Sequence, residues 1–193
     1  AVLLLYPFGN QLVKLAQITI PEHADEKEQK PDEFAILDER FLEKPAFAME
    51  LCKNATIKMA EEAKDALELS LENLHIYDEK RVDKIITLEQ SVDRYEDALG
   101  TYLVKLNNCD LSQSDSRTLS ILLHCIGNFE RISDHAVNIT DSLTEMNQKD
   151  LHFSKKALEE MEVFSKALKD IVEATCTAFV EADLEKARRI EPF

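Results

Sequence analysis

The sequence predicts an all-α fold, in which an elongated antiparallel three-helix bundle is followed by the start of a second, truncated helical repeat. Turn-forming residues are scarce, with three glycines and five prolines in 193 residues. The stretch 46–191 has no proline and only two glycines, Gly100 and Gly127, whereas strands and hairpins need turn residues at short intervals. Hydrophobic residues make up 45% of the chain. In this stretch they recur every three or four positions, as they do on one face of a helix.

The chain is expected to divide into four segments. Residues 1–20 hold an apolar run followed by Lys14, a pattern typical of the cytoplasmic end of a membrane helix; an ordinary buried segment is the alternative. Residues 21–44 are predicted to be a charged linker, because they contain prolines and lack an apolar period. Residues 45–150 form the three-helix repeat, and residues 151–193 begin the second repeat, which the end of the fragment cuts short.

Each expected helix starts at a residue suited to that position. Pro45 fits the first turn of a helix, where its missing N–H group costs nothing. The later helices are expected to start at side chains that accept hydrogen bonds from the first turn, namely Asp78, the Ser112-x-x-Asp115 box, Ser154 and Asp183.

Apolar residues on the predicted helices mark the sides that should be buried. The first helix has an inner face of small residues, with Cys52, Ala55, Met59, Ala63 and Ala66. The second alternates its apolar residues by three and four, as in a bundle seam, at Ile85, Leu88, Val92, Tyr95, Leu99, Tyr102 and Leu106. The third has a similar seam at Leu119, Leu122, Ile126, Phe129, Ile132, Ala136, Ile139 and Leu143. The fourth shows Leu158, Met161, Phe164, Leu168, Ile171 and Phe179.

A short internal similarity favours the second repeat. Residues 184–191 can be aligned with residues 82–89, with matching hydrophobic, acidic and lysine positions at the start and an aliphatic–glutamate pair at the end. The offset is 191 − 89 = 102 residues, about the length of one three-helix unit.

The formal net charge of −15 restricts the classes of partner. Nucleic acid is not expected to bind, because its phosphates need a basic surface. Cations and basic proteins are compatible with the charge. For most of the acidic residues, however, a solvated surface is sufficient explanation.

Two pairs of carboxylates occupy equivalent places on the second and third helices. Glu89 and Asp93 are four residues apart, as are Glu130 and Asp134, so each pair lies on one helix face. Glu89 directly follows the seam residue Leu88, and Glu130 directly follows Phe129 in the same way. Both pairs therefore start at the edge of the apolar stripe, and Glu96, Asn138 and Asp141 extend these edges.

Two interpretations of this pattern remain open. Carboxylates gathered by helix packing repel one another, and a bound hard cation with oxygen ligands would remove the repulsion. Alternatively, these are solvated acidic faces with Arg94 and Arg131 as counter-charges. A ferritin-like di-iron enzyme places a histidine three residues after a glutamate on facing helices, whereas His135 follows Glu130 at a spacing of five. No catalytic or cofactor-binding residue is predicted, and the protein is not expected to be an enzyme.

Two segments resemble the motifs of the PhoU family. Residues 129–141, FERISDHAVNITD, are similar to the PhoU signature on the last helix of its three-helix repeat, and residues 88–93, LEQSVD, resemble the partner motif on the preceding helix. Further segments resemble the PhoU-like tail of bacterial sodium/phosphate cotransporters, namely DSRTL at 115–119 and YLVKL at 102–106. The N-terminal run, the acidic linker and LDER at 37–40 resemble the connection between the last membrane helix of these transporters and the tail.

The resemblance implies a set of metal ligands. Members of this family consist of two three-helix repeats, and some bind multinuclear metal clusters through such motifs. Carried over to matching positions, the ligands are Glu89, Asp93, Glu130 and Asp134. The implied cofactor is a metal ion or a multinuclear cluster, of iron or another divalent cation.

The resemblance also implies a function and a location. It predicts a cytoplasmic regulatory or accessory domain of a sodium-dependent phosphate transporter, at the cytoplasmic face of the bacterial inner membrane. The expected partner is the membrane-embedded transporter domain of the same chain, and a homo-oligomer is left open. The alternatives are a free-standing PhoU-like signalling adaptor and a metal-dependent helical enzyme.

Overall fold

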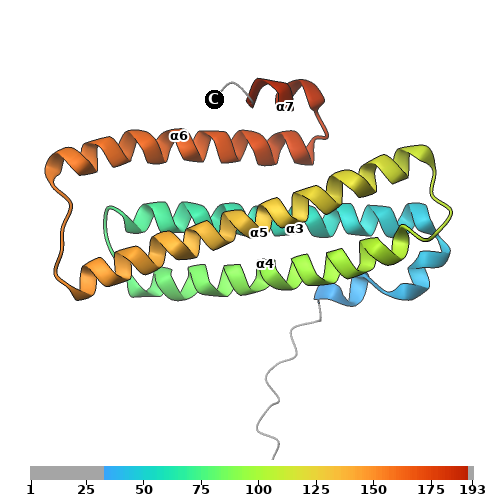
Figure 1. Cartoon of the computed structure of the whole chain (residues 1–193), viewed down its shortest axis with the longest axis horizontal. Coiled ribbons are helices and arrows are strands. Elements are labelled where there is room, and N and C mark those ends of the chain that lie inside the picture. The colour runs from blue at the N-terminus through green and yellow to red at the C-terminus, as the bar shows by residue number, and fades with distance from the viewer. Residues whose placement is uncertain (1–32, 191–193) are drawn as a thin grey trace, which may run out of the picture. The chain divides into compact units, whose positions relative to one another are not determined.

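The computed structural model describes residues 33–190, and all regular structure in this range is helical (Figure 1). The predicted membrane-helix end at 1–20 and the first half of the predicted linker at 21–44 lie outside the described residues. The elements are the 3-10 helices η2 (Glu33–Ile36) and η3 (Glu39–Glu43) and the α-helices α3 (Pro45–Asn73), α4 (Glu79–Leu106), α5 (Gln113–Gln148), α6 (Lys155–Val180) and α7 (Leu184–Ile190).

Helices α3, α4 and α5 pack side by side, with α4 antiparallel to both neighbours (Figure 1). The connections between them are short, at residues 74–78 and 107–112, and short connections place consecutive helices antiparallel. The predicted all-α class and the three-helix bundle are therefore confirmed. Helix α6 lies along α3, and α7 folds back on α6.

The predicted helix starts are confirmed by hydrogen bonds from the first turns. Pro45 is the first residue of α3. The side chain of Asp78 accepts from the Lys80 N–H at 2.9 Å. The three later caps work in the same way, with distances of 3.1 Å for Ser112 with Asp115, 3.2 Å for Ser154 with Ala157 and 2.9 Å for Asp183 with Glu185.

Helices α5 and α6 both end at a residue in the left-handed conformation. Asp150 has φ 52° and Ala182 has φ 51°. The next N–H groups close the helix ends, from Leu151 to the Met146 carbonyl at 2.9 Å and from Asp183 to the Ala178 carbonyl at 3.0 Å. This is the Schellman arrangement, in which glycine usually occupies the left-handed position. Neither residue here is glycine, so each junction holds a local strain of about 1 kcal/mol.

The core of the bundle is the predicted one. The small inner face of α3 is buried, and so is the seam of α4 except for Leu88, which is half-buried. On α5, Ile132 and Ile139 are half-buried and the other predicted seam residues are buried. The side of α5 that carries these two isoleucines therefore retains apolar surface.

Helix α6 differs from the prediction, because its seam is not a buried core. Phe164 is exposed and the other predicted seam residues are half-buried. The buried positions of α6 are Ser165, Val172, Cys176 and Ala178. The physical reason is that α6 packs mainly on α3, through one edge of its apolar stripe, and meets α5 near its end, where the rings of Phe129 and Phe179 are 5.3 Å apart. A seam is buried only where a second helix covers it.

The segment just before α3 contacts the bundle. The Tyr102 hydroxyl donates to the Asp38 carbonyl at 3.0 Å, and Lys105 pairs with Glu39 at 2.6 Å. The described end of the predicted linker is thus held against α4. No helix among the described residues combines the length and apolar character needed to cross a membrane.

Glycine in the interior of α5 gives a test of the fold. A methyl group at Gly127 would meet no heavy atom within 4 Å, and the backbone there is helical. We expect Gly127→Ala to raise the free energy of unfolding by about 0.5–1 kcal/mol, because alanine loses less backbone entropy on folding.

Urea denaturation followed by circular dichroism measures this difference. Leu122→Ala is the matched core substitution on the same helix, and its buried side chain predicts a loss of about 2–5 kcal/mol. A destabilised Gly127→Ala variant would contradict the described position of α5.

Candidate metal centre

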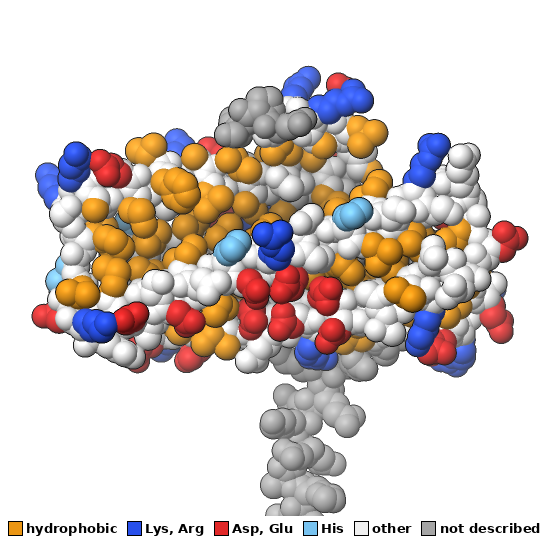
Figure 2. All heavy atoms as spheres, viewed as in Figure 1, with side chains coloured by type: hydrophobic (Ala, Val, Ile, Leu, Met, Phe, Trp, Pro, Cys, Tyr) orange, Lys and Arg blue, Asp and Glu red, His pale blue; other side chains and the backbone are white. Residues whose placement is uncertain are grey.

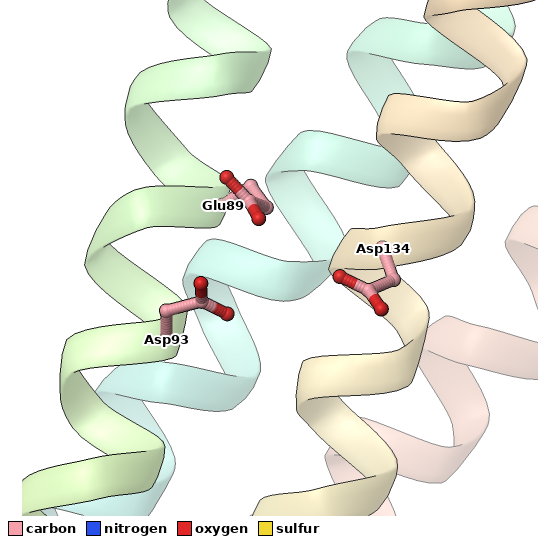
Figure 3. Close-up of side chains that lie close together, drawn as sticks. All are labelled: Glu89, Asp93 and Asp134. Atoms are coloured by element: carbon pink, nitrogen blue, oxygen red, sulfur yellow. The ribbon is translucent and has the colours of Figure 1, made fainter.

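The candidate site lies between α4 and α5. Glu89 and Asp93 come from successive turns of α4, and Asp134 comes from α5. Figure 3 shows the three carboxylates directed into the space between the two helices. One oxygen of each lies within 4.8 Å of the others. The group contains no histidine and no cysteine.

The packing of the neighbouring residues explains this position. Val92 precedes Asp93 and Ser133 precedes Asp134, and both are fully buried. Because consecutive helix positions are about 100° apart, burying one residue directs the next to the edge of the interface. The small side chain of Ser133 also turns back to its own helix, where its hydroxyl donates to the Glu130 carbonyl at 2.8 Å.

Glu130 lies beside this group. It is not among the three residues whose oxygens meet within 4.8 Å, but it is close enough to Asp134 for the two carboxyl groups to share a hydrogen bond. The structure thus brings Glu89, Asp93 and Asp134 together and places Glu130 at the edge. That these four residues bind a metal stays a prediction.

Burial and mutual repulsion raise the pKa values of three of these carboxyl groups. Burial is the largest cause for Glu89, followed by the charges of Asp93 and Asp134. The Asp93 pKa is raised by burial and then by Asp134 and Asp97. For Glu130, burial comes first, then the charge of Asp134 and its hydrogen bond. A raised pKa means that the folded protein disfavours the negatively charged form of that carboxyl group.

The sequence interpretation missed Asp97. Its charge raises the Asp93 pKa, so it belongs to the electrostatic surroundings of the site. The signal was available, because Asp97 is four residues after Asp93 and continues the spacing that begins at Glu89.

The donor set fits a hard cation. Three carboxylate oxygens in mutual reach are the ligands that divalent cations such as Mg²⁺ and Mn²⁺ prefer. A cation bound there would offset the repulsion that raises the pKa values. The alternative, an acidic face neutralised by arginine, has less support at Arg131, since no described ion pair joins Arg131 to these carboxylates.

Fold and site together define a class: a helical bundle domain with a carboxylate cluster on the face between its second and third helices. Comparison with known families finds a PhoU domain at residues 56–143. This range covers most of α3, all of α4 and most of α5, and it contains all four predicted ligands. No curated protein and no solved structure matches the chain.

A PhoU domain indicates a phosphate-related regulatory or adaptor role. Domains of this family are helical and are not typically enzymes.

The raised pKa values predict how stability depends on pH in the absence of divalent cations. The folded chain holds more protons at Glu89, Asp93 and Glu130 than the unfolded chain does, between the ordinary and the raised pKa values. The free energy of unfolding contributed by the cluster therefore falls as pH rises through this interval. We expect Asp93→Asn to weaken this dependence and to stabilise the fold at neutral pH by a few tenths of a kcal/mol, about the size of a like-charge pair on a helix.

Denaturation at several pH values in a chelating buffer measures both effects. Asp83→Asn is the control, because Asp83 is an exposed carboxylate on the same helix and lies outside the cluster. Equal behaviour of the two variants would show that no repulsion is concentrated at Asp93.

Proposed function

We propose that this chain is a cytoplasmic PhoU-like domain that regulates a sodium-dependent inorganic phosphate transporter and binds divalent cations at the α4–α5 cluster. The PhoU domain at residues 56–143 carries the proposal. Support for the transporter comes from the sequence resemblance, in particular from the apolar run that ends near Lys14 and the charged segment after it.

The physical role of the domain is to bias a transporter between states. A domain can do this only if it makes different contacts in the two states, docking in one and releasing in the other. Here a charged segment, 21–44, separates the apolar run from the bundle. Its end is held against α4 through Asp38 and Glu39, so residues 21–32 make the connection. A chain of that length leaves the bundle room to reach more than one contact surface.

The cation would be held by Glu89, Asp93 and Asp134, with Glu130 beside them. Its chemistry would be electrostatic, since a divalent charge offsets carboxylate repulsion between α4 and α5. Cation occupancy would therefore change how firmly these two helices pack. Such a change is one means by which a phosphate-related signal could alter the contacts of the domain.

Metal content tests the ligand assignment. We expect the purified protein to contain a divalent cation, by elemental analysis, and an Asp93→Ala/Asp134→Ala variant to contain much less. The control is Asp65→Ala/Asp83→Ala, which removes two exposed carboxylates from α3 and α4 outside the cluster. Equal metal content in all three proteins would refute the assignment.

Phosphate uptake tests the regulatory role. In the transporter that carries this chain, removal of the residues after Ala16 is expected to change the rate, the affinity or the phosphate-dependent control of sodium-driven uptake. Replacement of the bundle by an unrelated helical domain of similar size controls for loss of bulk. Unchanged uptake in all three respects would exclude this role and favour the free-standing adaptor.

A further inference from the structure

The segment through which the chain enters the bundle is held to α4 by two polar contacts. We call this segment, residues 33–44, the strap. The Tyr102 hydroxyl donates to the Asp38 carbonyl at 3.0 Å, and Lys105 pairs with Glu39 at 2.6 Å. Both contacts are made near the C-terminal end of α4, beside which the strap lies in Figure 1. The strap is therefore attached to a helix that lies far from it in the sequence.

The attachment of the strap buries little surface. No side chain of η3 (Glu39–Glu43) is buried. The side chains of Lys105 and Glu39 are 44% and 70% exposed, and exposed ion pairs contribute little to stability. Phe41 packs edge to face on Phe47, with ring centroids 5.2 Å apart, but Phe47 remains 48% exposed. Release of the strap therefore exposes only a small apolar area.

Tyr102 is the anchor of the strap. Its side chain is 3% exposed and belongs to the buried seam of α4. Its hydroxyl bonds to the backbone carbonyl of Asp38, so the contact does not depend on the side chain of that residue. A buried hydroxyl without a partner is costly, but release of the strap lets water reach it. The hydroxyl is therefore satisfied both when the strap is attached and when it is released.

We propose that the strap is releasable and that its state sets the length of chain between the bundle and a membrane domain. The role of this length rests on the proposed function, which places the membrane domain before residue 21. While the strap is attached, residues 21–32 make the connection, and such a chain spans at most about 40 Å. After release, residues 21–44 make the connection, and the limit rises to about 80 Å.

The two lengths favour different docking surfaces. A surface beyond the shorter limit is reached only after release, so docking there and release of the strap favour each other. A nearer surface is favoured by the attached strap, because a shorter connection keeps the bundle at a higher effective concentration around it. The strap therefore selects between a near and a far docking state of the domain.

The strap is separate from the carboxylate cluster. Figure 2 shows acidic side chains gathered near the middle of the bundle. Tyr102 follows Asp93 by nine residues on α4, which places it about 14 Å further along the helix axis. Substitutions that release the strap therefore leave the predicted cation ligands in place, and the two parts of the domain can be tested independently.

Limited proteolysis of the full chain with thermolysin measures release, because the cleavage rate follows the open population when reattachment is faster than cleavage. We expect cleavage at Phe41 and Leu42, located by mass spectrometry, to become about two- to tenfold faster in Tyr102→Phe, which loses the hydrogen bond but keeps the ring. Tyr77→Phe is the matched control, because it removes a hydroxyl contact with Thr144 at the other end of the bundle. Equal cleavage of the two folded variants, or no cleavage within the strap, would overturn the releasable strap.

Sodium-driven phosphate uptake tests what release does. In the transporter that carries this chain, Tyr102→Phe is expected to shift the phosphate-dependent control of uptake in the same direction as a Gly/Ser insertion within residues 21–32, because both lengthen the connection. If Tyr102→Phe releases the strap but leaves this control unchanged, while removal of the tail still alters uptake, the strap does not set the docking state and the proposed function stands. Unchanged uptake after removal of the tail would instead refute the proposed function, and with it the role of the length.

Discussion

Helix α3 carries alanine at many of the positions where it meets its neighbours, and the arrangement of the other helices depends on this. Its buried alanines are at most 1% exposed, and they lie at 48, 55, 60, 63 and 66. Interaxial distances between packed helices vary over about 8–10 Å with the side chains at the contact, and short side chains give the closest approach. The largest buried side chains include Tyr95 and Leu99 of α4, and α3 adds Met49 and Met59 between its alanines. One small-faced helix can therefore contact α4, α5 and α6.

The carboxylate cluster depends on the same packing. Helices α4 and α5 are both drawn to α3, and their acidic edges are brought together as a result. The repulsion between Glu89, Asp93 and Asp134 is small beside the burial of seam residues such as Leu99 and Phe129. Burying each of these side chains stabilises the fold by about 1.5–3 kcal/mol. Apolar packing thus maintains a local concentration of negative charge that the carboxylates would not adopt by themselves.

Most of the fold could be predicted from the sequence because its determinants are local. Asp78 and Ser154 cap helices through bonds to residues two or three positions away, and the seam of α4 is a periodic pattern on one helix. The position of the cluster was predictable in part, since the phase of Glu89 and Glu130 beside the seam marks an edge. The sequence could not show that Asp134 meets the α4 pair while Glu130 stays beside it, because that depends on how α4 and α5 are offset along their axes.

Which side of α6 is buried could not be predicted from the sequence, for a related reason. Its apolar residues form a broad stripe, and periodicity alone does not decide which part of a stripe is buried. That choice depends on how many helices lie against it. In the described residues α3 covers one edge, so Ser165 is buried and Phe164 is exposed. The α6 segment was correctly predicted to be helical with an apolar stripe, but the burial of each residue depends on which helices pack against it.

The slight attachment of α6 has a consequence for how the molecule opens. The helix is held to the bundle by a few contacts, including the pair with Lys64 of α3 and Glu173 at 2.7 Å and the pair with His75, just after α3, and Glu162 at 2.9 Å. The strained residues Asp150 and Ala182 lie just before and just after it. Proteins open in cooperative units of unequal stability, and the units with few buried apolar contacts open first. The amides of α6 therefore exchange with solvent through sub-global openings that leave α3, α4 and α5 folded, and a single unfolding transition describes the bundle rather than the whole chain.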